Sequence, residues 1–182
     1  MKKFIALALL LFVIATGAFA MDRNFGFGVG YNMGTADNDY YNDDFYYAGI
    51  YLFGFFGINR FIELNLGLIE KWYYQYDYFD YSMTGMTALQ LGIYGKYPFS
   101  LGSNFVLFPT AGVDFEFDVF DGDLWHEFCI RGGLGMDLFL SERFFLRGHL
   151  LYGFGFPISD SSWYQIGSSS GFQAKLGLGR MF

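Results

Sequence analysis

Hydrophobic and polar residues alternate with a period of two along most of the chain. From Phe25 to Met33, for example, Phe, Val, Tyr and Met occupy the odd positions and Gly or Asn the even ones. This period is typical of a β-strand with one apolar and one polar face. Eight such runs occur, at Phe25 to Met33, Phe45 to Phe56, Phe61 to Tyr73, Thr84 to Tyr97, Asn104 to Phe120, Asp123 to Leu138, Phe144 to Phe156 and Gly171 to Phe182. Each has at least the roughly nine to eleven residues that a tilted membrane strand needs, so we predict an all-β fold.

The connections between these runs are short at one end and longer at the other. The short ones are Gly57 to Arg60, Pro98 to Ser103 and Phe139 to Arg143, and the longer polar ones are Gly34 to Asp44, Tyr74 to Met83 and Pro157 to Ser170. The remaining connection contains Asp121-Gly122, a two-residue hairpin signal, and therefore predicts an outer loop nearly flush with the membrane. This alternation favours antiparallel strands in an up-and-down barrel.

Charged residues on the polar faces indicate which way the faces point. Asp114, Glu116 and Asp118 occupy alternate positions of one run, and three such carboxylates cannot face lipid. A soluble barrel with these charges outside would crowd Phe, Leu and Tyr into a small interior. Polar faces that alternate glycine with long charged groups fit a narrow lumen instead. We therefore predict an eight-stranded antiparallel up-and-down transmembrane β-barrel, closed because unpaired backbone groups are costly in lipid.

Aromatic residues and one proline add two local expectations. Aromatic side chains near predicted strand ends are expected at the membrane interface; they are Tyr46, Tyr47, Trp72, Tyr73, Trp125 and Trp163. Pro109 falls in the middle of a predicted strand and lacks a backbone donor, so a bulge or local irregularity is expected there.

Composition and charge agree with a barrel in a membrane. The chain is 53% hydrophobic and only 16% charged, against about 25% charged residues in ordinary soluble domains. Residues 1 to 20 form a predicted signal peptide, with Lys2 and Lys3, an apolar run from Phe4 to Ile14, and a cleavage site at Ala18-Phe19-Ala20. Residues 21 to 182 are the predicted barrel domain, with nine basic against 18 acidic residues and hence no basic footprint for nucleic acid. The lone Cys129 cannot form an internal disulfide.

Inward charges of both signs are expected to form a paired network in the lumen, because burying them unpaired is costly. Arg131 and Arg147 are the predicted centres, with partners among the acidic residues of the inward faces. The predicted network comprises Glu63, Asp114, Glu116, Asp118, Glu127, Arg131, Asp137, Arg147, His149 and Lys175. Such a network either plugs the barrel or gates a narrow pore, and the excess of acids predicts a preference for cations in any conductance.

No catalytic, metal or cofactor site is predicted. His149 and His126 lack the neighbours that catalysis or metal binding needs, and the serines of the last loop, Ser161, Ser162 and Ser168 to Ser170, are interpreted as a polar loop. The outer loops carry many aspartates and no Lys or Arg. They are interpreted as a solvated acidic surface, with weak binding of divalent cations or of an extracellular partner as alternatives.

The end of the chain carries a family resemblance. Phe182, preceded in phase by Leu178, Leu176 and Phe172, resembles the C-terminal signal that the assembly machinery of bacterial outer-membrane proteins reads, although Arg180 interrupts the apolar phase. The mature chain is similar to the small eight-stranded outer-membrane barrel family that includes OmpA-type transmembrane domains, OmpX and OmpW. The resemblance implies a monomer in the bacterial outer membrane, surrounded by lipid and assembled by that machinery. With Phe182 last, no cell-wall-binding domain is expected to follow.

Three functions remain open from the sequence. The first is a structural or surface-interaction barrel with a closed polar lumen and acidic extracellular loops. The second is a passage protein for small, possibly hydrophobic molecules, or a narrow cation-preferring pore. The third, a lipid-modifying enzyme, is implied only by other barrels of this compartment that use a serine and a histidine, so the prediction is that the chain is not an enzyme.

Overall fold

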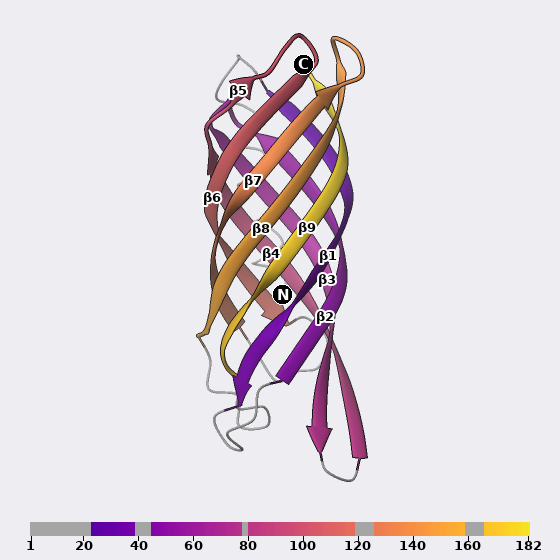
Figure 1. The fold of residues 1–182 in the computed structure, drawn as a ribbon, viewed down its shortest axis with the longest axis vertical. Helices are drawn as coiled ribbons and strands as arrows, with labels where there is room; N and C mark the ends of the chain where they lie inside the picture. The colour runs from indigo at the N-terminus through magenta and orange to yellow at the C-terminus, as the bar shows by residue number, and fades with distance from the viewer. Residues whose placement is uncertain (1–22, 39–44, 78–79, 119–125, 159–165) are drawn as a thin grey trace, which may run out of the picture.

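The strands of the protein form a single barrel and are tilted relative to its long axis (Figure 1). The computed structural model describes residues 23–38, 45–77, 80–118, 126–158 and 166–182. The strands are β1 (Asn24–Asn38), β2 (Phe45–Gly57), β3 (Ile62–Asp77), β4 (Asp80–Lys96), β5 (Phe99–Ser100), β6 (Phe105–Asp118), β7 (His126–Phe139), β8 (Phe144–Pro157) and β9 (Ile166–Met181). The described residues include no helix that is long and apolar enough to cross a membrane.

Eight long strands close the barrel, and β5 is a short addition. Hydrogen bonding runs in the order β4, β3, β2, β1, β9, β8, β7, β6, and the pairing of β4 with β6 completes the ring. Every pairing is antiparallel. The predicted fold class is therefore confirmed. The predicted signal peptide at residues 1 to 20 and the Asp121-Gly122 hairpin lie outside the described residues.

The faces of the strands point as the alternation predicts. The outer wall carries exposed apolar side chains from the long strands, among them Phe27, Val29, Leu52, Leu66, Ile93, Ile130, Leu134, Leu150, Phe154 and Leu176. Inward positions are buried and largely polar or glycine. The alternation of a β-strand thus separates an apolar exterior from a polar interior around the whole ring.

Two predicted interface aromatics lie inside the barrel instead. Tyr47 and Tyr73 are 5% and 8% exposed, and their ring centroids are 5.9 Å apart in the lumen. Both occupy inward positions, so the alternation of the strand outweighs the preference of a tyrosine for the interface. Tyr46, by contrast, is 64% exposed on the outer face. Trp125 and Trp163 lie outside the described residues.

The connection predicted at Tyr74 to Met83 is wrong, because β3 and β4 continue through it. Their pairing runs without interruption to Asp77 opposite Asp80. In contrast, β2 pairs with β3 only as far as Tyr74, and β6 pairs with β4 only as far as Ala88. The paired ends of β3 and β4 therefore project beyond the barrel as a hairpin, at the bottom of Figure 1. The loops predicted after β1 and β8 are also shorter than expected, since β1 reaches Asn38 and β9 begins at Ile166.

Pro109 lies opposite a break in the neighbouring strand. The ladder of β6 with β7 passes through Pro109 without a register shift. On the other side, β4 ends at Lys96 and β5 resumes at Phe99 in the same register. Tyr97 N donates to Pro109 O at 3.1 Å, and Pro109 has no N–H to return the bond. The irregularity expected at this proline is thus an interruption of the partner strand at residues 97 and 98, where the connection predicted at Pro98 to Ser103 begins.

Candidate functional site

The interior of the barrel holds a dense set of charged side chains. Each comes from an inward position of a strand, and each is at most 8% exposed. Five carboxylates and five cations are buried among the described residues: Glu63, Asp114, Glu116, Glu127, Asp137, Lys71, Lys96, Arg131, Arg147 and Lys175. Charges this deeply buried persist only when they are paired and hydrogen-bonded, so their contacts define what the lumen can do.

One group of ion pairs lies at the end of the barrel that carries the short turns. The turn-end cluster consists of Glu63, Lys96, Asp137 and Arg147. Arg147 binds Asp137 through two bonds of 2.6 Å, from Nε to Oδ1 and from Nη2 to Oδ2. Arg147 Nη1 also bonds Glu63, and Lys96 Nζ lies 3.0 Å from Glu63 Oε2. Two cations thus face two carboxylates, and the two parallel bonds from Arg147 to Asp137 are the geometry that favours arginine.

A second group of ion pairs lies toward the opposite end. The loop-end cluster consists of Lys71, Asp114, Glu116, Glu127 and Arg131. Arg131 donates from Nε to Asp114 Oδ2 at 2.8 Å and from Nη2 to Glu116 Oε1 at 2.9 Å. Lys71 Nζ bonds Glu116 and lies 3.2 Å from Glu127 Oε2. Two cations here face three carboxylates, and hydroxyl donors from Tyr94 and Ser169 support Asp114 and Glu127.

Lys175 lies between the two clusters and forms no ion pair with a described residue. Its Nζ is 3.4 Å from Asn65 Oδ1 and 4.9 Å from the centroid of the Tyr94 ring. Asn65 in turn donates to Glu63 at 3.0 Å, and Tyr94 bonds Asp114. Lys175 thereby links the turn-end and loop-end clusters through neutral partners.

Aromatic rings fill the lumen between the charges. The guanidinium carbon of Arg147 lies 4.7 Å from the Phe55 ring and 4.8 Å from the Phe145 ring. Inward glycines on neighbouring strands make room for such rings: a Cβ on Gly30 would lie 2.2 Å from Cε1 of Tyr51. The interior is thus packed with side chains, as expected for an eight-stranded barrel.

Several buried polar atoms in the lumen have no protein partner within the described part of the chain. They belong to Asn32, Tyr51, Gln90, Asp114, His149 and Gln173. Buried polar atoms of this kind are usually satisfied by ordered water, because leaving them unpaired costs roughly 1–3 kcal/mol each. We expect water between the ion-pair clusters.

Most of the network residues predicted from sequence lie in these clusters. Arg131 contacts Asp114 and Glu116, and Arg147 contacts Glu63 and Asp137. Glu127 is bound by Lys71, and Lys175 and His149 lie apart from the ion pairs. The side chain of Asp118 lies outside the described part of the molecule.

Sequence reasoning missed Lys71 and Lys96 as members of the network. Lys96 belongs to a predicted inward face, and Lys71 is in phase with inward Glu63 and Ile69, so the alternation extended to the strand ends would have found both. With them, buried acids and bases are equal in number among the described residues. The predicted excess of acids is thus absent among the described residues, which do not include the side chain of the predicted inward Asp118.

The histidines and serines form no catalytic arrangement in the described part of the structure. The ring of His149 packs edge-on against Phe108, with centroids 5.4 Å apart, and Ser169 bonds Glu127. Ser168 Oγ donates to Asp37 Oδ2 at 2.6 Å, and the ring of His126 packs against Phe117. Ser161 and Ser162 lie outside the described residues.

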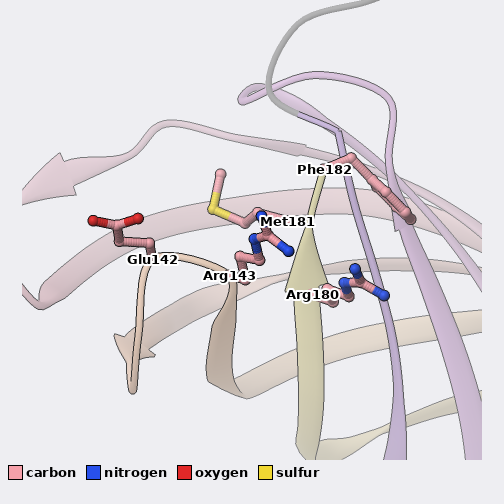
Figure 2. Close-up of a pocket in the computed structure, with 5 residues that line it drawn as sticks. All are labelled: Glu142, Arg143, Arg180, Met181 and Phe182. Atoms are coloured by element: carbon pink, nitrogen blue, oxygen red, sulfur yellow. The ribbon is translucent and has the colours of Figure 1, made fainter.

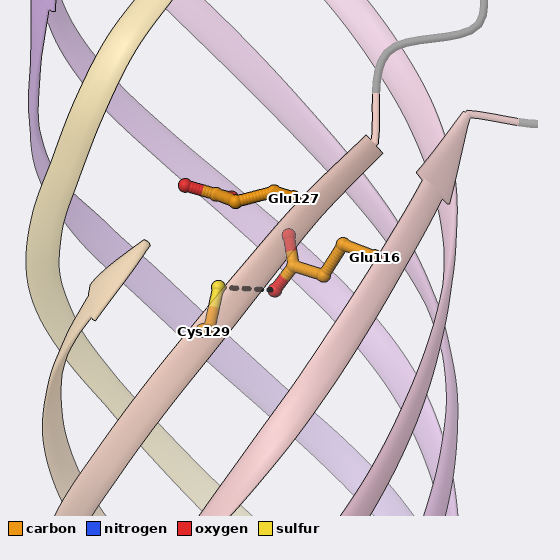
Figure 3. A group of neighbouring side chains, drawn as sticks. All are labelled: Glu116, Glu127 and Cys129. Carbon is orange, nitrogen blue, oxygen red and sulfur yellow. Dashed lines mark hydrogen bonds between the residues drawn. The ribbon is translucent and has the colours of Figure 1, made fainter. Parts of the chain in front are cut away.

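A group of potential metal ligands lies within the loop-end cluster. Glu116, Glu127 and Cys129 each offer a ligand atom, and these atoms lie within 4.8 Å of one another (Figure 3). Cys129 Sγ donates to Glu116 Oε1 at 4.0 Å. However, the ammonium group of Lys71 binds both carboxylates. The positive charge that a metal ion would bring is already supplied by this lysine.

Comparisons with known proteins show the fold. The sequence matches no protein-family model and no curated protein. The chain is similar to the crystal structure of the outer membrane protein OprG from Pseudomonas aeruginosa, with a TM-score of 0.58, 14% identity, and 91% of this chain and 98% of that chain covered. It is also similar to Neisserial surface protein A, with a TM-score of 0.54, 11% identity, and coverage of 87% and 97%. At these identities the similarity shows the fold, which is that of small eight-stranded outer-membrane β-barrels.

Proposed function

We propose that the protein is a monomeric outer-membrane β-barrel with a closed, ion-paired lumen and a structural or surface-interaction role. The observation that carries the proposal is the inverted distribution of side chains, with large apolar residues exposed outside and ten charged residues buried inside. An apolar belt of this kind is stable only against acyl chains. Under this proposal residues 1 to 20 are the removed signal peptide, and Phe182, 74% exposed at the end of the wall, belongs to the assembly signal.

The ion pairs support a plug. The turn-end and loop-end clusters each cross the lumen between strands on different sides of the ring, since Arg147 of β8 reaches Glu63 of β3 and Lys71 of β3 reaches Glu127 of β7. Breaking a buried pair by removing one partner costs about 3–5 kcal/mol. An ion crossing the lumen would have to separate such pairs in two successive clusters.

Planar-bilayer recording of residues 21 to 182 tests the plug. We expect the wild type to be silent, and Arg131→Ala to produce conductance steps because it removes the cation that holds Asp114 and Glu116. Arg60→Ala, in the exposed turn between β2 and β3, is the matched control and is expected to remain silent. Steps in the wild type would contradict the closed lumen. Absence of conductance in the wild type, Arg131→Ala and Arg60→Ala would remove the pore hypothesis. It would indicate that the turn-end cluster alone is enough to plug the lumen.

A narrow pore is the second candidate function. It is favoured by Lys175, which has no ion pair with a described residue, and by the buried polar atoms of the lumen that have no partner among the described residues. Because buried acids and bases balance among the residues that the structure describes, any such pore is expected to select weakly between cations and anions, with a reversal potential near zero in a salt gradient. Passage of hydrophobic molecules through the wall receives no comparable support, because the long described strands pair in a closed ring.

The surface-interaction role rests on the projecting β3–β4 hairpin. Beyond Tyr74 and Ala88 its two strands pair with each other and with no other described strand. Within the described ranges the outer backbone edges of this hairpin are unpaired, and unpaired edges readily accept another strand. The aspartates of the outer loops at residues 39, 43, 44, 121, 123 and 160 lie outside the described residues, and binding of divalent cations there remains an alternative.

A further inference from the structure

A cleft of about 420 Å³ opens at the turn end of the barrel. It lies between the turn that joins β7 to β8 and the last residues of β9, and Figure 2 shows its lining residues. They are Glu142, Arg143, Arg180, Met181 and Phe182. Met181 N donates to Arg143 O at 2.8 Å, so the turn and the last strand are held together by backbone. The cleft is therefore part of the barrel framework.

Arg180 lies where the apolar outer wall ends. It follows Leu176 and Leu178 in the outward phase of β9, and these leucines are 58% and 41% exposed. The guanidinium carbon of Arg180 lies 5.9 Å from the ring centroids of both Phe144 and Phe182. An arginine held by aromatic rings at the edge of an apolar belt places its charge at the level of lipid headgroups.

The two arginines of the cleft have no carboxylate partner among the described residues. Glu142 also lines the cleft, but its carboxylate points away from both guanidinium groups (Figure 2). Two arginines that share one cleft can bind a phosphate with several charge-assisted hydrogen bonds.

We propose that Arg143 and Arg180 bind the phosphate of a glycerophospholipid at the turn end of the barrel. The acyl chains of this lipid lie along the outer wall beside Phe144 and Phe182. The assignment rests on the proposed function, since it requires the outer wall to face a bilayer. It goes beyond that function because it names a specific lipid site on one side of the barrel.

Native mass spectrometry of the refolded barrel tests the site. Detergent micelles are doped with dioleoyl phosphatidylglycerol, or with dioleoyl glycerol, which has the same acyl chains and no phosphate. The wild type is expected to retain the phospholipid and not the diacylglycerol. Arg143→Gln/Arg180→Gln is expected to retain the phospholipid about tenfold less, as loss of two charged contacts predicts. Arg60→Gln, an arginine of another turn stacked 4.5 Å over Phe61, is the matched control and is expected to behave as the wild type.

Three results would overturn the site: equal retention by the double variant, equal retention of the diacylglycerol, or an equal loss in Arg60→Gln. If Arg180 is needed for folding, Arg143→Gln alone serves, because Arg143 lies in an exposed turn and its backbone bond survives the substitution. Folding is checked by the heat-dependent shift of the barrel band on a gel. A wild-type chain that never folds in lipid would refute the proposed function, whereas a folded barrel without lipid selectivity would refute the phosphate site alone.

Discussion

Arg147 shows how a single residue is accommodated in the lumen. Its guanidinium is 2% exposed, is forked onto Asp137, bonds Glu63, and lies among the rings of Phe55 and Phe145. The hydrogen bonds and the ring faces together replace water around the charge. Lys175 is also buried but lacks a carboxylate partner among the described residues, so the two residues are expected to respond oppositely to substitution.

Arg147→Met is expected to destabilise the barrel by about 3–5 kcal/mol, because it leaves Asp137 and part of the charge of Glu63 buried without a cation. Lys175→Met, of similar shape, is expected to be neutral or stabilising, since it removes a buried charge that no ion pair compensates. Urea unfolding in lipid vesicles, followed by tryptophan fluorescence, measures both. Equal losses of unfolding free energy in the two variants would show that the ion pairs of Arg147 are not what stabilises the lumen.

Gly30 gives a second test at the residue scale. Gly30→Ala places a methyl group against the Tyr51 ring, and overpacking of this kind costs about 1–3 kcal/mol. Tyr51→Ala removes the ring that the methyl group would meet. The double variant is therefore expected to lose about 1–2 kcal/mol less unfolding free energy than the sum of the losses in the two single variants. The same vesicle unfolding measures the cycle. Strict additivity would mean that the glycine does not make room for the tyrosine.

The direction of each side chain could be predicted from the sequence, but its partner could not. Alternation alone places Glu63, Arg131 and Arg147 inside the barrel. Which of them meet depends on strand tilt and stagger, which bring Glu63 of β3 to Arg147 of β8 across the lumen. These quantities belong to the closed ring, and a period-two pattern carries no information about height along the axis.

At the scale of the strand, the length of each strand was harder to predict from the sequence than its presence. All eight long strands lie where alternation predicts them, because β-branched, aromatic and glycine residues repeat regularly. The ends differ most in β3 and β4, where a polar, tyrosine-rich stretch from Tyr74 to Met83 was expected to be a loop. Backbone pairing there continues beyond the ring. The polarity of a segment indicates whether it lies in the membrane or in water more reliably than whether it is a strand or a loop.

The projecting hairpin is expected to be dispensable for folding. Replacement of residues 75 to 82 by Asn-Gly joins Tyr74 to Met83, which already pair, through a two-residue turn. We expect the unfolding free energy to change by less than about 0.5 kcal/mol, as for surface changes away from the core. The heat-dependent gel shift and urea unfolding check this. Loss of folding would show that the hairpin, and not the ring alone, stabilises the barrel.

The whole molecule separates its charges by location. Buried acids and bases balance among the described residues of the lumen, whereas the outer loops carry aspartates without Lys or Arg. The acidic excess of the sequence therefore belongs to loops and not to the described lumen. A balanced interior and an apolar exterior both follow from the low polarity of the surroundings, in which an unpaired charge is costly.

The central claim is that the apolar outer wall faces lipid. Electron paramagnetic resonance of a nitroxide on Leu150→Cys, in a Cys129→Ala background and reconstituted in vesicles, tests it directly. Leu150 is 59% exposed on the wall, so its label should collide with dissolved oxygen far more often than with a water-soluble nickel chelate. A label on Ser141→Cys, in the turn between β7 and β8, should show the reverse preference. A Leu150 label as accessible to the nickel chelate as the Ser141 label would contradict the account.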